Sequence, residues 1–364
     1  MVARVLKPRF RPRYRYEQQI KVKESEKDKN KDTTIFSNSF VNHHNYHKSQ
    51  NSQNNTSKQL FMLKERRSKI DYEEKFSIPD ISAIKSLSPE FRREMLKMIS
   101  PWEWLCNPTF LGLENIPKEG PVLFVANHTL MAILDIVCLS KKLFESKGIA
   151  LNILADHYHY KIPYWRDFLY RIGVVDGTRA NCSYLMKEKQ YLLVFPGGAR
   201  EAFKLKGEKY TLIWKQRSGF AHMAIKHQCP IIPVSSVGPE ECYDILIDNQ
   251  EIYNSPLGRL FKTIGYKQEN IFPVVKGIGP TIIPKPQKFY IKFGKPIDTS
   301  SLNGECDNIQ YCIDIYDYTK NEIQRGIDEL LILRSDNDQS EIVKRLKDKL
   351  LEISIDQIVK FLTK

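Results

Sequence analysis

Short apolar runs of β-forming residues alternate with helical stretches from about residue 120 onward, and this alternation constrains the fold more than any other feature of the sequence. The expected strands cover residues 122–126, 149–154, 174–175, 191–195, 231–237 and 288–293. The expected helices between them cover residues 130–143, 165–172, 180–187 and 218–227. Continuous apolar strands that alternate with helices are typical of parallel sheets buried on both faces. We therefore predict an α/β fold with a mostly parallel central sheet flanked by helices.

The chain ends in two further amphipathic stretches, at about 307–333 and 340–362, which predict a C-terminal helical pair. A shorter amphipathic helix is expected at 89–100, where Ser88 and Pro89 form a favourable helix start. Together these features predict four parts: a disordered basic, Asn-rich arm (1–60), a linker with the amphipathic helix (61–118), the α/β domain (119–300) and a helical extension (301–364).

Positive charge is concentrated in the N-terminal arm. The whole chain has a net charge of +13, and residues 1–60 hold 13 Lys and Arg against 5 Asp and Glu, so eight of those charges lie there. Apolar residues in the arm follow neither the helical nor the strand period, so burial would not offset the entropy cost of ordering it. We expect a solvated tail or, alternatively, a basic-aromatic contact for anionic lipid or RNA.

The sequence indicates neither a membrane-spanning helix nor a metal site. No apolar stretch reaches the length of about 18 residues that a spanning helix needs. The seven cysteines are scattered and form no CxxC pair, so neither a disulfide framework nor a zinc site is indicated, and we expect no metal. Contact with a bilayer is instead expected at its surface, through residues 89–104 and the basic arm.

The first segment that carries chemistry is residues 125–135, in which Asn127 and His128 end a predicted strand and Asp135 follows. An imidazole oriented by a carboxylate is a general base with a fixed tautomer. The seven-residue spacing places the pair about 10.5 Å apart along a continuous helix, which is too far for a hydrogen bond. A dyad therefore requires that His128 precede the helix and that the intervening residues form a loop. If the helix begins at Thr129 instead, Asp135 is only structural.

Three more segments lie at predicted strand ends, where open α/β sheets place their ligand sites. Residues 173–179 end in the cation Arg179. Residues 195–201 read FPGGARE and are followed by Lys204, Lys206 and Lys209. Two adjacent glycines allow backbone N–H groups to approach an anion, and an arginine can donate two hydrogen bonds to a phosphate. Residues 230–238 form a strand that contains two prolines.

In this order and spacing the four segments resemble the phospholipid/glycerol acyltransferase superfamily, whose blocks read NHx₄D, G-V-[IV]-x-x-x-R, FPEGTR and [VI]-P-[VI]. The resemblance covers about residues 100–300. The family's Glu and Thr in the third block are replaced by Gly197 and Ala199. This version, together with residues 165–167 and 207–210, resembles the diacylglycerol-acyltransferase-like branch, whose acceptor has no phosphate.

The resemblance implies direct transfer of an acyl group from acyl-CoA to a glycerolipid hydroxyl, with no further cofactor. His128 is then the general base and Asp135 orients it. Backbone N–H groups at Gly197 and Gly198 are candidates for the oxyanion site. The resemblance assigns substrate binding to Asn127, Arg179, Gly197, Gly198, Arg200, Glu201 and Lys204, with Glu201 pairing with Arg200 or capping the next helix.

The preferred acceptor implied by the resemblance is diacylglycerol, followed by a lysophospholipid or glycerol phosphate. Because the substrates are amphiphiles, we expect a peripheral protein on the cytoplasmic face of an intracellular membrane, such as endoplasmic reticulum or a lipid droplet. Two alternatives stay open at this point. One is a lipid-binding member of the fold without turnover, which the altered His–Asp spacing and the missing Glu would explain. The other is a nucleic-acid-binding protein driven by the basic arm.

Overall fold

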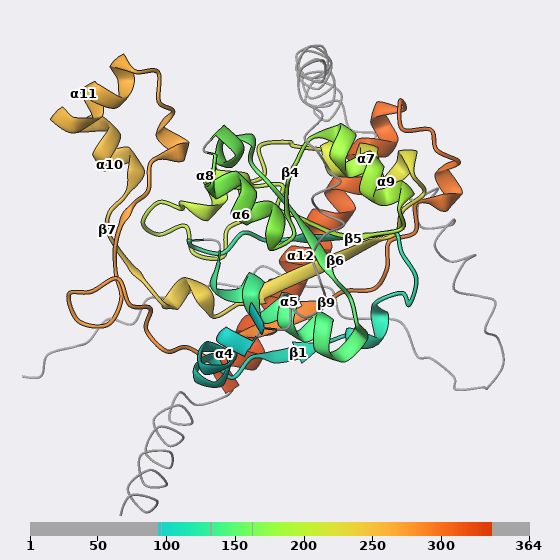
Figure 1. Ribbon diagram of the computed structural model, residues 1–364, viewed down its shortest axis with the longest axis horizontal. Coiled ribbons are helices and arrows are strands. Elements are labelled where there is room, and N and C mark those ends of the chain that lie inside the picture. Colours follow the sequence, from blue (N-terminus) through green and yellow to red (C-terminus); the bar gives the residue numbers. More distant parts are fainter. Residues whose placement is uncertain (1–93, 96, 132, 162, 337–364) are drawn as a thin grey trace, which may run out of the picture. The chain divides into compact units, whose positions relative to one another are not determined.

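The computed structural model describes residues 94–336 apart from 96, 132 and 162, and all of them lie in one unit of the chain, Leu60–Lys364 (Figure 1). The predicted basic arm, half of the predicted helix at 89–100 and the second helix of the C-terminal pair lie outside the described residues, so the division into four parts stays a prediction. Within the described part, no helix is both long and apolar enough to cross a bilayer.

The core of the protein is one seven-stranded sheet. Its strands, in spatial order, are β1 (Thr109–Leu111), β9 (Tyr290–Phe293), β6 (Ile231–Val237), β2 (Val122–Ala126), β5 (Tyr191–Val194), β3 (Leu151–Ala155) and β4 (Val174–Asp176). The five strands from β6 to β4 run parallel to their neighbours, whereas β9 pairs antiparallel with β6. A mostly parallel central sheet is therefore confirmed.

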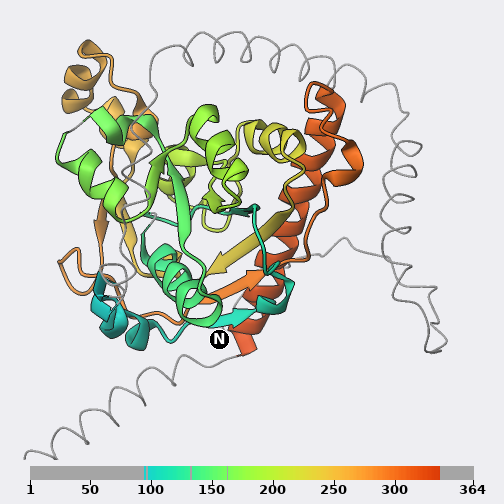
Figure 2. The ribbon, with the colours of Figure 1, turned by 45° about the vertical axis from the view of Figure 1, so that its right-hand side comes forward.

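Helices cover both faces of this sheet. The α-helices of the described part are α4 (Ser100–Cys106), α5 (Leu134–Lys147), α6 (Trp165–Arg171), α7 (Arg179–Lys187), α8 (Gly198–Ala202), α9 (Gly219–Lys226), α10 (Asn249–Asn254), α11 (Pro256–Thr263) and α12 (Ile309–Asp336), of which α10 and α11 lie away from the sheet (Figure 1). Figures 1 and 2 show α5 and α12 on opposite sides of the strands. The first helix of the predicted C-terminal pair is α12.

The period of two along β6 explains the two layers. Ile232 and Val234 are buried with Leu139 and Leu143 of α5. Ser235 points the other way and donates a hydrogen bond from Oγ to the Ile323 carbonyl of α12, 2.9 Å away. Helix α12 can approach this closely because it carries Gly326, where a Cβ atom would lie 2.3 Å from the Ser235 hydroxyl.

Two parts of the fold differ from the prediction. The helix expected from residue 130 begins at Leu134, because the backbone before it bonds to the α8 region: the Met131 N–H donates to the Ala202 carbonyl, and Met131 has a φ of 63°. The second difference is an excursion between β6 and β9, in which β7 (Asp244–Ile247) pairs with β8 (Val274–Lys276) and α10 and α11 lie between them.

Candidate active site

The first and third sequence motifs meet at the carboxyl end of the sheet, because β2 and β5 are neighbouring parallel strands. His128 follows β2, and the FPGGARE segment follows β5. The imidazole of His128 stacks on the ring of Phe195, with 4.3 Å between centroids and 18° between planes. The structure therefore brings the predicted base and the glycine turn into direct contact.

Glu201 holds the backbone of His128 in place. One carboxylate oxygen accepts a hydrogen bond from the His128 N–H at 2.9 Å, and the other accepts from the Ile213 N–H at 3.4 Å. The side chain is fully buried, and burial raises the pKa of Glu201 to about 7, with the Lys204 ammonium opposing that shift. Glu201 does not pair with Arg200, so that expectation is corrected: its partners are two backbone N–H groups.

The ring of His128 is poorly hydrated and stays neutral. Burial lowers the pKa of His128 to about 3, and the nearby Lys204 ammonium adds to this effect. Within the described part of the chain, its Nδ1 atom is buried without a hydrogen-bond partner. A neutral imidazole can accept a proton, and an unpaired buried ring nitrogen is unusual enough to point to a function.

Asp135 lies at the start of α5, after the loop that the predicted dyad requires. Its carboxylate accepts hydrogen bonds from the Thr129 hydroxyl at 2.9 Å and from the Ile136 N–H at 3.1 Å. Burial raises its pKa, and the hydrogen bonds from the Thr129 hydroxyl and the Ile136 N–H oppose that rise. The described residues show no hydrogen bond between His128 and Asp135, so the pairing of these two side chains stays a prediction.

Asn127 braces the sheet beside the base. Its side-chain amide donates to the Ser236 carbonyl at 3.0 Å, and its amide oxygen accepts from the Ser236 N–H at 2.8 Å. The two bonds tie the end of β2 to β6. With both ends of the amide engaged, Asn127 positions the strand end, and its contact with substrate stays a prediction.

The glycine turn leaves one backbone donor free. Gly198 has a φ of +55° and donates its N–H to the Phe195 carbonyl at 3.0 Å, so this N–H is part of the turn. The Gly197 N–H, in contrast, makes no hydrogen bond to any residue that the structure describes. The Gly197 carbonyl accepts from Nη1 of Arg217 at 3.3 Å. Sequence reasoning missed Arg217, which lies 20 residues away and belongs to none of the four motifs.

Arg200 and Lys204 are both engaged by carboxylates. Arg200 donates from Nη2 to Glu208 at 2.5 Å, while its Nη1 is buried and has no partner among the described residues. Lys204 is buried and forms an ion pair with the buried Glu240; its ammonium also donates to the His128 carbonyl at 3.1 Å. Lys204 was predicted to bind substrate, and the structure gives its ammonium an internal partner, Glu240.

Arg179 stands apart from these residues. It opens α7 just after β4, the outermost strand on that side of the sheet. Three strand spacings, roughly 14 Å, separate β4 from β2. The fold therefore does not bring Arg179 to His128, although both follow carboxyl ends of parallel strands.

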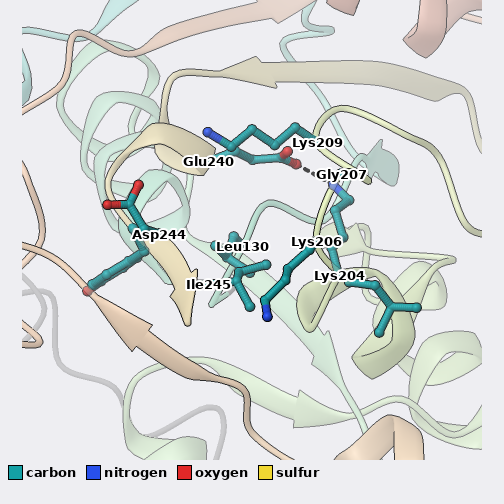
Figure 3. Close-up of a pocket in the computed structure, with 10 residues that line it drawn as sticks. Leu130, Lys204, Lys206, Gly207, Lys209, Glu240, Asp244 and Ile245 are labelled. Atoms are coloured by element: carbon teal, nitrogen blue, oxygen red, sulfur yellow. Dashed lines mark hydrogen bonds and ion pairs between the residues drawn. The ribbon is translucent and has the colours of Figure 1, made fainter. Parts of the chain in front are cut away.

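A pocket of about 190 Å³ lies beside Leu130 and Lys204 (Figure 3). It is lined by Leu130, Lys204, Leu205, Lys206, Gly207, Lys209, Glu240, Tyr243, Asp244 and Ile245. The imidazole of His128 does not line it; Lys204 connects the two, because its ammonium reaches both the pocket and the His128 carbonyl. The volume suits a polar group rather than an acyl chain, since drug-sized ligands fill about 300 Å³ or more.

Two other polar groups lie away from these motifs. The Nδ1 atom of His157 lies 2.7 Å from the buried carboxylate of Asp176, beside β4. His222, Cys306 and Asp307 offer ligand atoms within 4.8 Å of one another, which is the arrangement among the described residues that fits a metal ion. That group shares no residue with the four motifs, so a metal there would not act at His128.

Comparisons with known proteins agree with this arrangement. Residues 107–237 match the family model described as Acyltransferase. The chain is 30% identical over 256 residues to phytyl ester synthase 2, chloroplastic, of Arabidopsis thaliana, covering 65% of this chain and 36% of that protein. It is 36% identical over 123 residues to the human "DGAT1/2-independent enzyme synthesizing storage lipids", covering 34% of this chain and 37% of that protein.

A solved structure, that of the 1-acyl-sn-glycerophosphate (LPA) acyltransferase PlsC from Thermotoga maritima, aligns with 73% of this chain and 88% of its own, at 19% identity and a TM-score of 0.43. That likeness is too distant to carry an argument. The chain spans little more than a third of the length of the Arabidopsis and human relatives.

Proposed function

Residues 107–237 are an acyltransferase domain of the glycerolipid acyltransferase superfamily, as the four motifs predicted, and we propose that the protein transfers an acyl group from acyl-CoA to a lipid hydroxyl. One observation carries the proposal: a neutral imidazole, His128, stacks beside the glycine turn at the carboxyl end of the sheet. No other cofactor takes part. Diacylglycerol is the favoured acceptor, followed by a lysophospholipid or glycerol phosphate.

In the proposed reaction His128 accepts the proton of the acceptor hydroxyl as the oxygen attacks the thioester carbonyl. The tetrahedral intermediate collapses with loss of the CoA thiolate, which takes the proton back from the imidazolium. Asp135 orients the ring and stabilises its charged form, for which its carboxylate exchanges the Thr129 hydroxyl for the unpaired Nδ1 atom of His128.

The negative charge on the carbonyl oxygen needs a donor nearby. The Gly197 N–H is our candidate, because it makes no hydrogen bond within the described residues and follows directly on Pro196 and Phe195, the residue that stacks on His128. The N–H of Gly198 is excluded from this role, since it closes the turn onto Phe195. One hydrogen-bond donor of this kind lowers the activation free energy of acyl transfer by about 3 kcal/mol.

The charges around the pocket favour a neutral acceptor. Three lysines and two carboxylates line it, and Lys204 and Lys206 have ion-pair partners in Glu240 and Glu251. Little positive charge is left for a phosphate on the acceptor. The relatives' names point the same way, because phytyl esters and storage lipids are uncharged products. The buried Nη1 of Arg200 is the candidate contact for a CoA phosphate.

The setting that suits these substrates is the surface of an intracellular membrane, on its cytoplasmic face, at endoplasmic reticulum or a lipid droplet. Both the thioester and the acceptor are amphiphiles that partition into a bilayer. The small pocket supports this choice, because it leaves acyl chains outside the protein fold.

A second candidate function is lipid binding without turnover. It is favoured by one observation: the Asp135 carboxylate accepts a hydrogen bond from the Thr129 hydroxyl and not from His128. Under this hypothesis Asp135 only caps the start of α5, and the imidazole is a packed core side chain.

An acceptor panel separates the two. Purified full-length protein is mixed with labelled acyl-CoA and diacylglycerol, phytol, a lysophospholipid or glycerol phosphate in lipid, and labelled product is counted. We expect transfer to diacylglycerol or phytol, and a loss of at least about a hundredfold in His128→Ala. His227→Ala is the matched control, since that histidine bonds to Ser183 outside the site, and its activity should stay near that of the unchanged protein. Acyl-CoA binding without transfer to any acceptor would establish the second function instead.

A further inference from the structure

The excursion between β6 and β9 forms a separate arm, residues 244–284, built from β7, α10, α11, β8 and the hairpin loop 277–284. Figures 1 and 2 both show α10 and α11 projecting beyond the sheet and its helices, with β7 leading out to them. Nothing in the four motifs or in the proposed reaction accounts for this arm.

Exposed apolar side chains are concentrated in the arm. Of the 21 large apolar side chains that are exposed among the described residues, 11 belong to it. They are Leu246, Ile247, Leu257, Leu260, Ile264, Tyr266, Phe272, Val274, Ile278, Ile282 and Ile283. A soluble monomer scatters such residues singly, so a cluster of this kind marks a contact surface.

Two elements of the arm present these side chains in an ordered way. Leu257, Leu260 and Ile264 follow the helical spacing and share one face of α11. The hairpin loop presents Ile282, which is 77% exposed. This loop is held by hydrogen bonds of 2.7 Å from the Gly277 N–H to the Thr281 carbonyl and from the Ile278 N–H to the Ile283 carbonyl. Both apolar surfaces are therefore formed before any partner arrives.

Each carboxylate of the 244–284 arm has a partner within the protein, either a lysine or a backbone N–H group. Asp244 pairs with Lys285, Glu251 with Lys206 and Glu269 with Lys215. Asp248 accepts the first N–H groups of α10 in a capping box.

Its cations are not neutralised in this way. Arg259, Lys262 and Lys267 have no carboxylate partner among the described residues; Lys262 lies over the Tyr253 ring, 4.5 Å from its centroid. Arg259 and Lys262 lie on the face of α11 opposite Leu257 and Leu260. An apolar face backed by unpaired cations is typical of a helix that lies in the headgroup region of an anionic bilayer.

The arm also begins at the pocket. Asp244 and Ile245 of β7 line the pocket, and the Asp244–Lys276 pairing puts the start of the hairpin loop beside Asp244. At the other end of the loop, the Lys285 N–H donates to the Cys242 carbonyl at 2.9 Å. A lipid held at the arm is thus next to the pocket.

We propose that residues 244–284 dock the protein on an anionic phospholipid bilayer through α11 and the 277–284 loop, so that a lipid hydroxyl can enter the pocket from the membrane. The choice of a bilayer over another apolar partner rests on the proposed function, whose substrates are lipids. This surface differs from the membrane contact predicted at residues 89–104.

The test measures binding of the full-length protein to sucrose-loaded vesicles by sedimentation. One vesicle preparation is phosphatidylcholine alone, and in the other phosphatidylserine replaces about a third of the lipid. We expect stronger binding to the anionic vesicles. Leu260→Ser with Ile282→Ser should weaken binding to both preparations by about tenfold or more. Arg259→Gln, Lys262→Gln and Lys267→Gln together should lower binding to anionic vesicles about a hundredfold and leave binding to phosphatidylcholine nearly unchanged.

Two control variants test the location. Ile332→Ser removes an apolar side chain of α12 that is 64% exposed, close to the 65% of Ile264, and should bind vesicles like the unchanged protein. Met98→Ser does the same for the segment predicted from the sequence. Loss of binding in Met98→Ser but not in the arm variants would overturn the proposal. A dimer that dissociates in Leu260→Ser with Ile282→Ser, without a change in vesicle binding, would overturn it too and assign the arm to a second copy.

A failure of this proposal can be told from a failure of the proposed reaction. Vesicle binding is measured without acyl-CoA, so it does not depend on turnover. Transfer to a dispersed short-chain diacylglycerol is measured without vesicles, and arm variants should keep that activity while they lose transfer to vesicle-borne acceptor. Transfer in both formats by the arm variants overturns the docking proposal and leaves the reaction intact. If vesicle binding depends on the 244–284 arm but no acceptor is acylated, the docking proposal is supported and the proposed acyl transfer is contradicted.

Discussion

Glu201 fills the space that a side chain at position 197 would occupy. A Cβ atom built on Gly197 would lie 1.8 Å from Oε2 and 2.4 Å from Cβ of Glu201. The superfamily pattern has a glutamate where this chain has Gly197, so the third motif lacks a carboxylate at that position. A carboxylate is nevertheless present there, supplied by the residue four positions later and bonded to the His128 backbone at 2.9 Å.

The first prediction is that Gly197→Ala destabilises the protein and lowers activity, because the added methyl group displaces the Glu201 side chain. We expect a loss of about 1–3 kcal/mol in the free energy of unfolding and at least a tenfold loss of acyl transfer. Glu201→Gly removes both the carboxylate and the Cβ atom that the new methyl group would meet, so the effects of the two substitutions in urea unfolding should not add. Additive effects would contradict the contact.

Gly219→Ala is the matched control for this pair. A Cβ at Gly219 meets no atom within 4 Å, and the residue opens α9 without a positive φ. The substitution should therefore change the free energy of unfolding by no more than about 1 kcal/mol, in the stabilising direction, and leave activity unchanged.

The second prediction concerns stability and pH at Glu201. Burial is the main cause that raises its pKa from 4.5 to about 7, so the ionised form is disfavoured in the folded state. The stability contributed by protonated Glu201 is complete below pH 4.5 and is lost as the pH rises through 7. Its loss costs about 3 kcal/mol by pH 8. Glu201→Gln does not titrate and should gain that amount relative to the unchanged protein between pH 4 and pH 8.

Urea unfolding of both proteins at several pH values measures this difference. His128 titrates in both, so its contribution cancels in the comparison. A gap between the two unfolding free energies that stays constant from pH 4 to pH 8 would show that folding leaves the pKa of Glu201 unchanged.

The third prediction concerns the pH dependence of the reaction. A general base must be neutral, and burial lowers the pKa of His128 to about 3, below its usual 6.5. The acid limb of kcat/KM should therefore lie below pH 5, with no inflection near 6.5. The profile is measured in Glu201→Gln as well, to remove the titration near 7. An inflection at 6.5 in both proteins would mean that the ring is hydrated in the working enzyme.

Six of the seven strands of the sheet could be predicted, because each contains a largely buried apolar run with a clear boundary. The edge strand β1 was missed, since none of its three residues is fully buried. Residues 122–126 and 231–237 were placed with the bounds that the structure has, and both are buried along their whole length. The arm at residues 244–284 could not be predicted, since β7 and β8 are three or four residues long and partly exposed. Short exposed strands give neither a buried run nor a clear alternation.

The site was predicted in its residues but not in its contacts. His128, Gly197 and Arg200 do lie together, because their strands are neighbours. The partner of Lys204 is Glu240, 36 residues away, and the partner of Asp135 is the hydroxyl of Thr129. No periodicity or spacing rule encodes pairs of this kind, since they depend on how loops from different strands pack above the sheet.

The fourth prediction compares two neighbouring lysines. Lys204 and Glu240 are 2% and 1% exposed at their side chains, whereas Lys206 and Glu251 are 44% and 48% exposed. Lys204→Met leaves a buried carboxylate unpaired and should cost about 3–5 kcal/mol in the free energy of unfolding. Lys206→Met, the control, should cost less than about 1 kcal/mol. Addition of Glu240→Leu to Lys204→Met should restore much of the loss; equal costs for the two lysines would contradict the burial.

The fifth prediction separates two arginines that the sequence treats alike. Nη1 of Arg200 is buried without a partner near His128, whereas Arg179 lies roughly 14 Å away along the sheet. Loss of a charge-assisted hydrogen bond costs about 1.5–3 kcal/mol, so Arg200→Gln should raise KM for acyl-CoA by tenfold or more. Arg179→Gln should change it less than about twofold. Glu208→Gln is added to Arg200→Gln so that no carboxylate is left unpaired.

A second acyl donor shows which part of the substrate Arg200 binds. Acyl-pantetheine has the thioester of acyl-CoA but lacks the nucleotide and its phosphates. If Arg200 contacts a CoA phosphate, KM for acyl-pantetheine should be the same in the unchanged protein and in the variant, because the contact is missing in both. An equal rise in KM with both donors would mean instead that Arg200 acts on the acceptor or on the shape of the glycine turn, which its neighbour Gly198 closes through the Phe195 carbonyl.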